Sequence, residues 1–190
     1  MIIEGVVTTE NSDGSVNIAP MGPRTDPSLA RLLLRPFPTS DTFQNLRRTG
    51  RGIFHITDDA ELIARAAIGK LETQPKLIAA PQNAGWIIAD ACRWLAFEAR
   101  SIDESGPRVE IDCEVVARET VRDFLGFNRA KHALIEGAIL ATRIGILPGE
   151  KITADFASLE VIVDKTAGEA ERRAWAVLRD YVRRRVSGES

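Results

Sequence analysis

Short segments in which hydrophobic and polar residues alternate dominate the first 122 residues of the chain. The clearest runs from Arg108 to Val115, where four charged residues alternate with four apolar ones. A period of two is typical of a β-strand with one buried face. The pattern predicts strands over 1–9, 15–19, 29–35, 53–56, 84–100 and 109–118. The turn residues 11–14 predict a hairpin between the first two strands.

Beyond Asp123 the spacing of apolar residues changes from two to about 3.6, which predicts a helical region. Three helices are expected, over 128–144, 150–164 and 168–186. We therefore divide the chain into a β domain, residues 1–122, and a helical extension, residues 123–190. A shorter helix is expected within the first domain, from Asp58 to Gly69.

Composition narrows the class of protein. The 190 residues carry a net charge of −2, so no basic surface for nucleic acid is indicated. No apolar run approaches the ~18 residues of a membrane span, and the N-terminus lacks a signal-peptide pattern, so we expect a soluble, cytoplasmic protein that does not bind membranes. Cys92 and Cys113 lack metal-ligand spacing and are expected to be buried, reduced thiols.

Two short motifs predict a site for a flat, phosphorylated molecule. The first, Asn17 to Gly22, carries a strand into a bend where a ligand can approach the backbone closely. The second, Ser40 to Asn45, opens a helix and offers hydroxyl, amide and backbone N–H groups to an anion. Each has a simpler alternative. Ser40 would be an ordinary helix cap, worth about 1 kcal/mol, and the bend would be a strand end.

Together the motifs resemble those of the FMN-binding split-barrel flavoproteins, whose flavin reductase branch carries a similar N-x-A-P strand and T-x-x-N helix start. This resemblance covers about residues 1–120. A closer likeness is to a little-characterised family of such barrels with a C-terminal helical extension, in which a block like that from Asn128 to Arg143 recurs. The resemblance implies a mainly β fold of the α+β class, a six-stranded antiparallel split β-barrel with a three-helix extension. It also implies a homodimer with FMN at or near the subunit interface.

The candidate FMN-binding residues follow from the two motifs and this resemblance. A guanidinium binds phosphate through two parallel N–H groups, so the arginine at the end of the third strand is retained among them. The candidates are Asn17, Ala19, Pro20, Met21 and Gly22 for the flavin ring, and Arg35, Ser40, Thr42 and Asn45 for the phosphate. Phe37 and Trp86 are aromatic candidates for covering the ring, although large aromatic residues usually belong to a core.

The first helix of the extension carries a narrow charged stripe of Arg129, His132, Glu136 and Arg143. Its other faces are apolar, which is typical of a buried helix. Buried charges must be paired, so Glu136 is expected to bridge to one of the three basic residues. Two roles stay open for the stripe: contact with a substrate at the flavin, or an ion network that docks the extension on the barrel or on another subunit.

The hypothesis for function is an FMN-dependent oxidoreductase that moves hydride between flavin N5 and a small substrate or nicotinamide, because the cofactor carries the chemistry. No catalytic acid, base or nucleophile is assigned. His55 has no neighbouring ligand cluster, so no metal site is expected. Two alternatives stay open. One is a non-catalytic module that stores, senses or delivers FMN, and the other is a structural or partner-binding barrel without cofactor.

Overall fold

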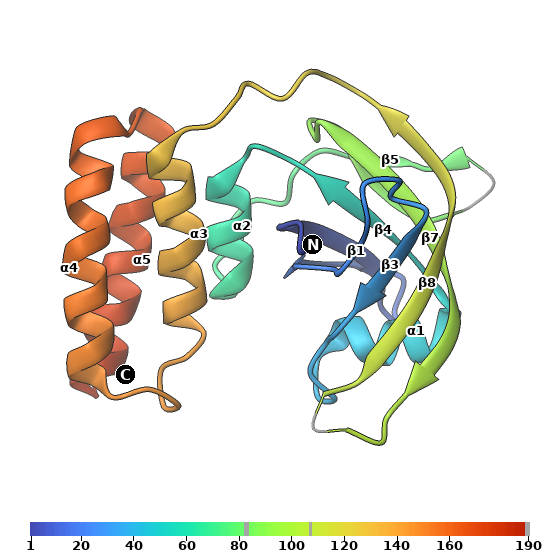
Figure 1. Ribbon diagram of the computed structural model, residues 1–190, viewed down its shortest axis with the longest axis horizontal. Coiled ribbons are helices and arrows are strands. Elements are labelled where there is room, and N and C mark those ends of the chain that lie inside the picture. Colours follow the sequence, from blue (N-terminus) through green and yellow to red (C-terminus); the bar gives the residue numbers. More distant parts are fainter. Residues whose placement is uncertain (82–83, 107, 189–190) are drawn as a thin grey trace. The chain divides into compact units, whose positions relative to one another are not determined.

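The computed structural model describes residues 1–81, 84–106 and 108–188, which form two units (Figure 1). The barrel unit comprises Met1–Thr57 and Gln74–Phe124, and the helical unit comprises Asp58–Thr73 and Leu125–Ser190. Each unit has its own apolar core.

The barrel unit is built on a six-stranded antiparallel sheet with the strand order β2-β1-β4-β7-β8-β3. Each neighbouring pair is antiparallel. This confirms the predicted fold class. The strands are β1 (Gly5–Glu10), β2 (Val16–Met21), β3 (Arg31–Leu34), β4 (Arg51–Ile56), β7 (Arg93–Asp103) and β8 (Glu110–Thr120).

The segment that follows β2 joins the sheet back to its other edge. Arg24 forms isolated bridges with Ile2, ahead of β1, and with Leu33 in β3. The Arg24 N–H donates to the Leu33 carbonyl at 3.0 Å, and the Leu33 N–H donates to the Arg24 carbonyl at 2.8 Å. Since β3 is an edge strand, this link satisfies backbone groups that an open sheet would leave unpaired.

Apolar side chains fill the interior of the barrel unit. Helix α1 (Asp41–Thr49) lies against β1 and β2 and adds Phe43 and Leu46 to this core. Burial of side chains of this size stabilises the fold by about 2–3 kcal/mol each. The strands contribute Val7, Leu32, Leu34, Phe54, Leu95, Phe97 and Ile111.

The prediction of one strand over 84–100 is wrong. This region contains β6 (Trp86–Ile88) and then β7, separated by a turn in which the Ala91 N–H donates to the Ile88 carbonyl at 3.1 Å. β6 pairs with β5 (Leu77–Ala79) in a separate two-stranded sheet. Hydrophobic residues occur on both sides of the turn, so the sequence pattern does not mark it.

His55 joins three strands of the barrel unit from a fully buried position in β4. The Ile88 N–H of β6 donates to Nε2 at 3.1 Å, and Nδ1 lies 3.2 Å from the Val6 carbonyl of β1. An accepting Nε2 requires the neutral ring with its proton on Nδ1. Burial is the main cause that lowers the pKa of His55 from 6.5 to about 4, and the hydrogen bond to Val6 opposes this shift.

Four helices form the helical unit: α2 (Ala60–Ala67), α3 (Arg129–Ala141), α4 (Gly149–Thr166) and α5 (Glu169–Ser187). Phe156 of α4 and Trp175 of α5 stack with 4.7 Å between ring centroids. Gly137 of α3 lies against this pair, because a Cβ there would be 2.9 Å from the Trp175 ring. The glycine therefore permits α3 to approach α5 closely.

Helix α2 belongs to the helical unit, whereas the predicted division at 122/123 placed it in the β domain. Ala60 and Ala64 of α2, with Ile68, contribute to the apolar core of the helices. Glu61 pairs with Arg173 of α5 at 3.5 Å. An amphipathic pattern predicts a helix but does not say which element covers its apolar face, so this grouping required the tertiary structure.

The low pKa of His55 makes the stability of the protein dependent on pH. The unfolded chain binds a proton near pH 6.5, whereas the folded chain binds it only near pH 4. The contribution of His55 is therefore complete above pH 6.5 and falls by roughly 3 kcal/mol as the pH drops to 4. An NMR titration of the two histidine rings should give one pKa near 4, for His55, and urea unfolding from pH 7 to 4 should become less steeply pH-dependent in His55→Gln.

The exposed His132 supplies the matched control, since His132→Gln should leave the pH dependence of unfolding unchanged. A His55 ring that titrates near pH 6.5 in the folded protein would contradict the assignment.

Candidate functional site

Helix α1 begins at the position predicted for phosphate binding. The Ser40 hydroxyl accepts the Phe43 N–H at 3.2 Å and donates to the Phe37 carbonyl at 2.8 Å, so Ser40 is the helix cap. Within the described residues, the backbone N–H groups of Asp41 and Thr42 make no hydrogen bond. These N–H groups lie at the positive end of the helix dipole, where an anion is stabilised.

Thr42 and Asn45 lie on the buried face of α1 and bind the β1–β2 hairpin. Their exposed fractions are 2% and 5%. The Asn17 amide donates to Thr42 Oγ1 at 3.0 Å and to Thr9 Oγ1 at 3.1 Å, and the Asn45 amide donates to Thr9 Oγ1 at 3.0 Å and to Asn11 Oδ1 at 2.7 Å. The structure thus brings three predicted site residues together in a structural link. A phosphate-binding role for these side chains stays a prediction.

The predicted ring-binding bend lies at an edge of the sheet. Ala19, Pro20 and Met21 are the last residues of β2, where proline is tolerated because an edge strand has backbone groups that need no partner. Gly22 follows, and a Cβ at this position would be 2.8 Å from a carboxylate oxygen of Glu4. The missing side chain of Gly22 therefore accommodates Glu4 at the surface of the bend.

Arg35 follows β3 and has an incompletely satisfied guanidinium. Its Nε lies 3.2 Å from a carboxylate oxygen of Glu110, close enough for an ion pair. The same Nε is buried and makes no hydrogen bond among the described residues. We conclude that the N–H does not point at the carboxylate. Each buried donor that is left without an acceptor costs about 1–3 kcal/mol. Because this Nε is covered by the protein, an anionic ligand would reach only the rest of the Arg35 side chain, which is 39% exposed.

Arg108 is a basic residue near α1 that the sequence analysis did not select. Its guanidinium carbon lies 4.0 Å from the centre of the Phe37 ring. The Phe37 carbonyl accepts hydrogen bonds from both the N–H and the hydroxyl of Ser40, so the aromatic ring is tied to the start of α1. The sequence does distinguish this residue: in the alternating segment 108–115, Arg108 is the one basic residue among the charged positions.

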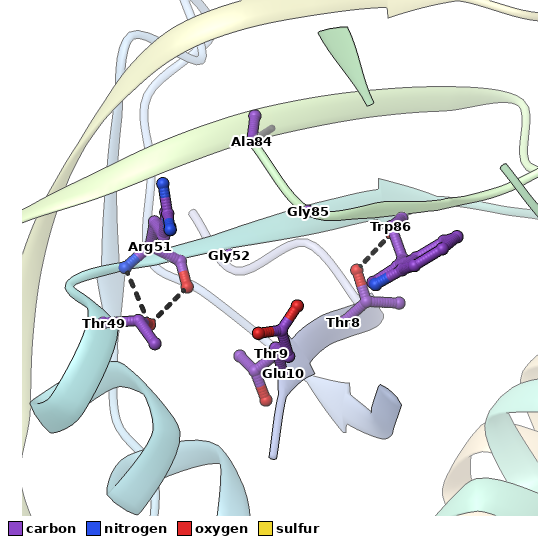
Figure 2. Close-up of a pocket in the computed structure, with 9 residues that line it drawn as sticks. All are labelled: Thr8, Thr9, Glu10, Thr49, Arg51, Gly52, Ala84, Gly85 and Trp86. Carbon is purple, nitrogen blue, oxygen red and sulfur yellow. Dashed lines mark hydrogen bonds between the residues drawn. The ribbon is translucent and has the colours of Figure 1, made fainter. Parts of the chain in front are cut away.

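A small pocket of about 40 Å³ lies between β1, β4 and the segment before β6 (Figure 2). The Thr8 hydroxyl donates to the Trp86 carbonyl at 2.6 Å on one side. On the other side, Thr49 Oγ1 accepts the Arg51 N–H at 3.3 Å. Pockets for cofactors usually enclose about 300–1,000 Å³, so this pocket alone is too small for a flavin.

The expectation of a buried charged stripe on α3 is wrong. Arg129, His132, Glu136 and Arg143 are all exposed, and no ion pair joins them in the described part of the chain. The Phe127 ring makes an edge contact with the ring of His132, with 5.7 Å between centroids. The apolar residues of α3 pack on the other helices, so water solvates the stripe.

Three other features bear on function in the described residues: possible metal ligands, the two cysteines and the apolar length of the helices. The described residues contain no group of three or more histidine, cysteine, aspartate or glutamate residues that could hold a metal ion. Cys92 and Cys113 are buried and form no disulfide, as predicted, and burial raises the pKa of Cys113 to about 12. Nor does this part of the chain contain a helix both long and apolar enough to cross a membrane.

Comparisons with known proteins relate the chain to flavin-binding folds. Residues 3–122 match the family described as Protein of unknown function (DUF447) N-terminal domain, and residues 128–180 match Protein of unknown function (DUF447). No curated protein matches the sequence.

Among solved structures, the FMN-bound DUF447 protein MM1853 from Methanosarcina mazei superposes with a TM-score of 0.81 at 20% identity, over 95% of this chain and 94% of that one. The 2-nitrobenzoate 2-nitroreductase NbaA from Pseudomonas fluorescens gives 0.53 at 18% identity, over 62% and 64%. The FMN-binding protein from Thermus thermophilus gives 0.52 at 14% identity, over 63% and 70%. These likenesses confirm the split-barrel fold.

The buried network predicts that Asn45 is a major source of stability. Asn45→Ala should lower the free energy of unfolding by about 2–3 kcal/mol, because two hydrogen bonds are lost: Asn11 loses this donor in a partly buried setting, and buried Thr9 keeps only the one from Asn17. Gln44→Ala, on the exposed face of the same helix, should cost less than about 1 kcal/mol. Urea denaturation measures both. Equal losses in the two variants would contradict the role given to the network.

Proposed function

The chain belongs to the DUF447 family, and on this basis we propose that it is an FMN-binding flavoprotein with oxidoreductase activity. The observation that carries the proposal is the start of α1, where two backbone N–H groups without hydrogen bonds lie close in the chain to the unsatisfied Arg35 guanidinium. A family member of the same fold was crystallised with FMN.

The residues present fit the phosphate end of FMN. A phosphate dianion needs several donors and positive charge, and charge-assisted hydrogen bonds to it are the strong kind. Among the described residues, the N–H groups of Asp41 and Thr42 can meet this need without breaking any hydrogen bond of the protein, and the partly exposed Arg35 side chain adds positive charge. Thr42 and Asn45 then act by holding α1 in place, since their side chains are bound to the hairpin.

The flavin ring is assigned to the bend of Ala19 to Gly22. This edge of the sheet leaves backbone groups of β2 unpaired on the side away from β1, and such groups can meet the polar edge of a flat ring. Bound FMN would supply hydride transfer, which protein side chains do not perform. The part of the chain is to bind and orient the cofactor, and no residue is assigned as an acid or a base.

A small molecule or a reduced nicotinamide is the proposed partner in the reaction. The nitroreductase and the oxidoreductases among the solved structures of similar fold support this class of chemistry. A non-catalytic FMN-binding module is the alternative, and it uses the same phosphate contacts. The two differ in whether a reductant reaches the bound flavin.

We also propose that two copies of the chain form the flavin site together. The pocket between β1 and β4 has room for only about 40 Å³, and none of the residues from Ala19 to Gly22 lines it. Cofactor pockets usually enclose about 300–1,000 Å³, so this pocket of a single chain does not enclose a flavin. Leu125 and Phe127 are 82% and 89% exposed, and exposed apolar residues of this size are typical of interfaces. A second copy that packs on these two residues would remove their apolar surface from water.

An absorbance spectrum from about 300 to 550 nm tests the main proposal. Protein reconstituted with FMN and freed of excess flavin should show one flavin per chain, and anaerobic NADH or NADPH should bleach it. A bound flavin that resists both reductants would favour the non-catalytic module. Absence of bound FMN after reconstitution would overturn the proposal and leave a structural or partner-binding barrel.

Sedimentation equilibrium tests the dimer. The wild-type protein should have twice the mass of the 20.8 kDa chain, and Leu125→Ser should shift it toward monomer and weaken FMN binding by about tenfold or more. Ile78→Ser removes an exposed apolar residue of the barrel unit and serves as the control. A wild-type monomer that binds FMN tightly would contradict the shared site.

A further inference from the structure

The outer face of β3 and β8 carries a ladder of paired charges. Arg31 binds Asp112 through its guanidinium, and Arg100 of the neighbouring β7 binds Glu114 at 2.8 Å. Arg35 lies 3.2 Å from Glu110, one step beyond the last strand pair. Opposite charges placed across strands stabilise a sheet by roughly 0.2–1 kcal/mol per pair, and Arg31, Arg35 and Arg100 each have a carboxylate within reach.

Arg108 ends this ladder and departs from its pattern. The pairing of β3 with β8 ends at Leu34 and Ile111. Continued for three more residues, the same register would place Phe37 opposite Arg108. The neighbour of Arg108 across the ladder is therefore an aromatic ring rather than a carboxylate. Within the described residues, Arg108 makes no ion pair, and its guanidinium lies over the Phe37 ring.

The contact with Phe37 ties the Arg108 guanidinium to a residue three positions before Ser40, the cap of α1. Stacking on an aromatic face restricts the guanidinium while its five N–H groups remain available. Phe37 is itself anchored, since Ser40 donates its N–H at 3.0 Å and its hydroxyl at 2.8 Å to the Phe37 carbonyl. The Phe37 ring is 51% exposed, so the guanidinium is accessible to a ligand.

We propose that Arg108, seated on the Phe37 ring, binds the phosphate group of FMN and makes the site selective for phosphorylated flavin over riboflavin. This inference rests on the proposed function. It adds a residue from the β7–β8 connection, outside both sequence motifs. The phosphate would then be approached from two sides, by the backbone of α1 and by a guanidinium without a competing carboxylate.

The test compares the dissociation constants of FMN and riboflavin, measured by quenching of flavin fluorescence, in the wild type, Arg108→Gln and Arg31→Gln. Arg108→Gln should weaken FMN binding by about tenfold or more, which is the loss of one charge-assisted hydrogen bond, and should change riboflavin binding less than about twofold. Arg31→Gln removes a guanidinium of the same charged face that has its own carboxylate, and it should change neither constant. Inorganic phosphate should compete with FMN in the wild type more strongly than in Arg108→Gln.

The outcomes separate this inference from the proposed function. A wild type that binds no FMN would overturn the function itself. FMN binding that is equally tight in the wild type and in Arg108→Gln would overturn the role of Arg108 alone. Equal weakening of FMN and riboflavin in Arg108→Gln would show that the residue does not act on the phosphate, which also overturns the inference.

Discussion

The hydrogen bonds between α1 and the β1–β2 hairpin are the constraint on which the candidate site depends. The side-chain amides of Asn17 and Asn45 each donate two hydrogen bonds to side chains in this interface, and Thr9 accepts one from each. A shift of α1 by one residue would bury these amides without acceptors, at a cost of several kcal/mol. The helix start, with its two available N–H groups, is therefore fixed by bonds to the side chains of Thr42 and Asn45 on the buried face of the helix.

The division into two units follows from how apolar surface is covered. The chain leaves the barrel unit after Thr57 and returns at Gln74, and the helix between them contributes Ala60 and Ala64 to the core of the helices. The helical unit is thus completed by a segment from the first half of the chain. Deleting the C-terminal helices would expose the apolar face of α2, so the extension is not an independent appendage.

Charge pairing on the barrel unit separates structural arginines from arginines available to a ligand. Arg31 and Arg100 have carboxylates in hydrogen-bonding geometry. Arg35 has a carboxylate at ion-pair distance but an unsatisfied Nε, and Arg108 has an aromatic ring in place of an acid. Both exceptions lie next to the segment that leads into α1. Two arginines therefore lie close in the chain or by contact to the start of α1, where the helix dipole is positive and where the first turn also carries the carboxylate of Asp41.

The amino-acid sequence by itself determined the segments that form the six strands of the main sheet, the helices beyond Asp123 and the start of α1, because periodicity, turn residues and helix caps are local properties. The six-stranded barrel itself was implied by the family resemblance. The sequence did not determine the break between β6 and β7, the grouping of α2 with the helices, or the exposure of the stripe on α3. These three features depend on which elements pack against each other in the folded protein. The motif residues Thr42 and Asn45 were found from the sequence, but their burial was decided by the hairpin that covers them. Arg108 acquires its place only in the tertiary structure, since the pairing of β3 with β8 ends near Phe37 and Arg108 and the two side chains meet beyond it, which no local pattern encodes.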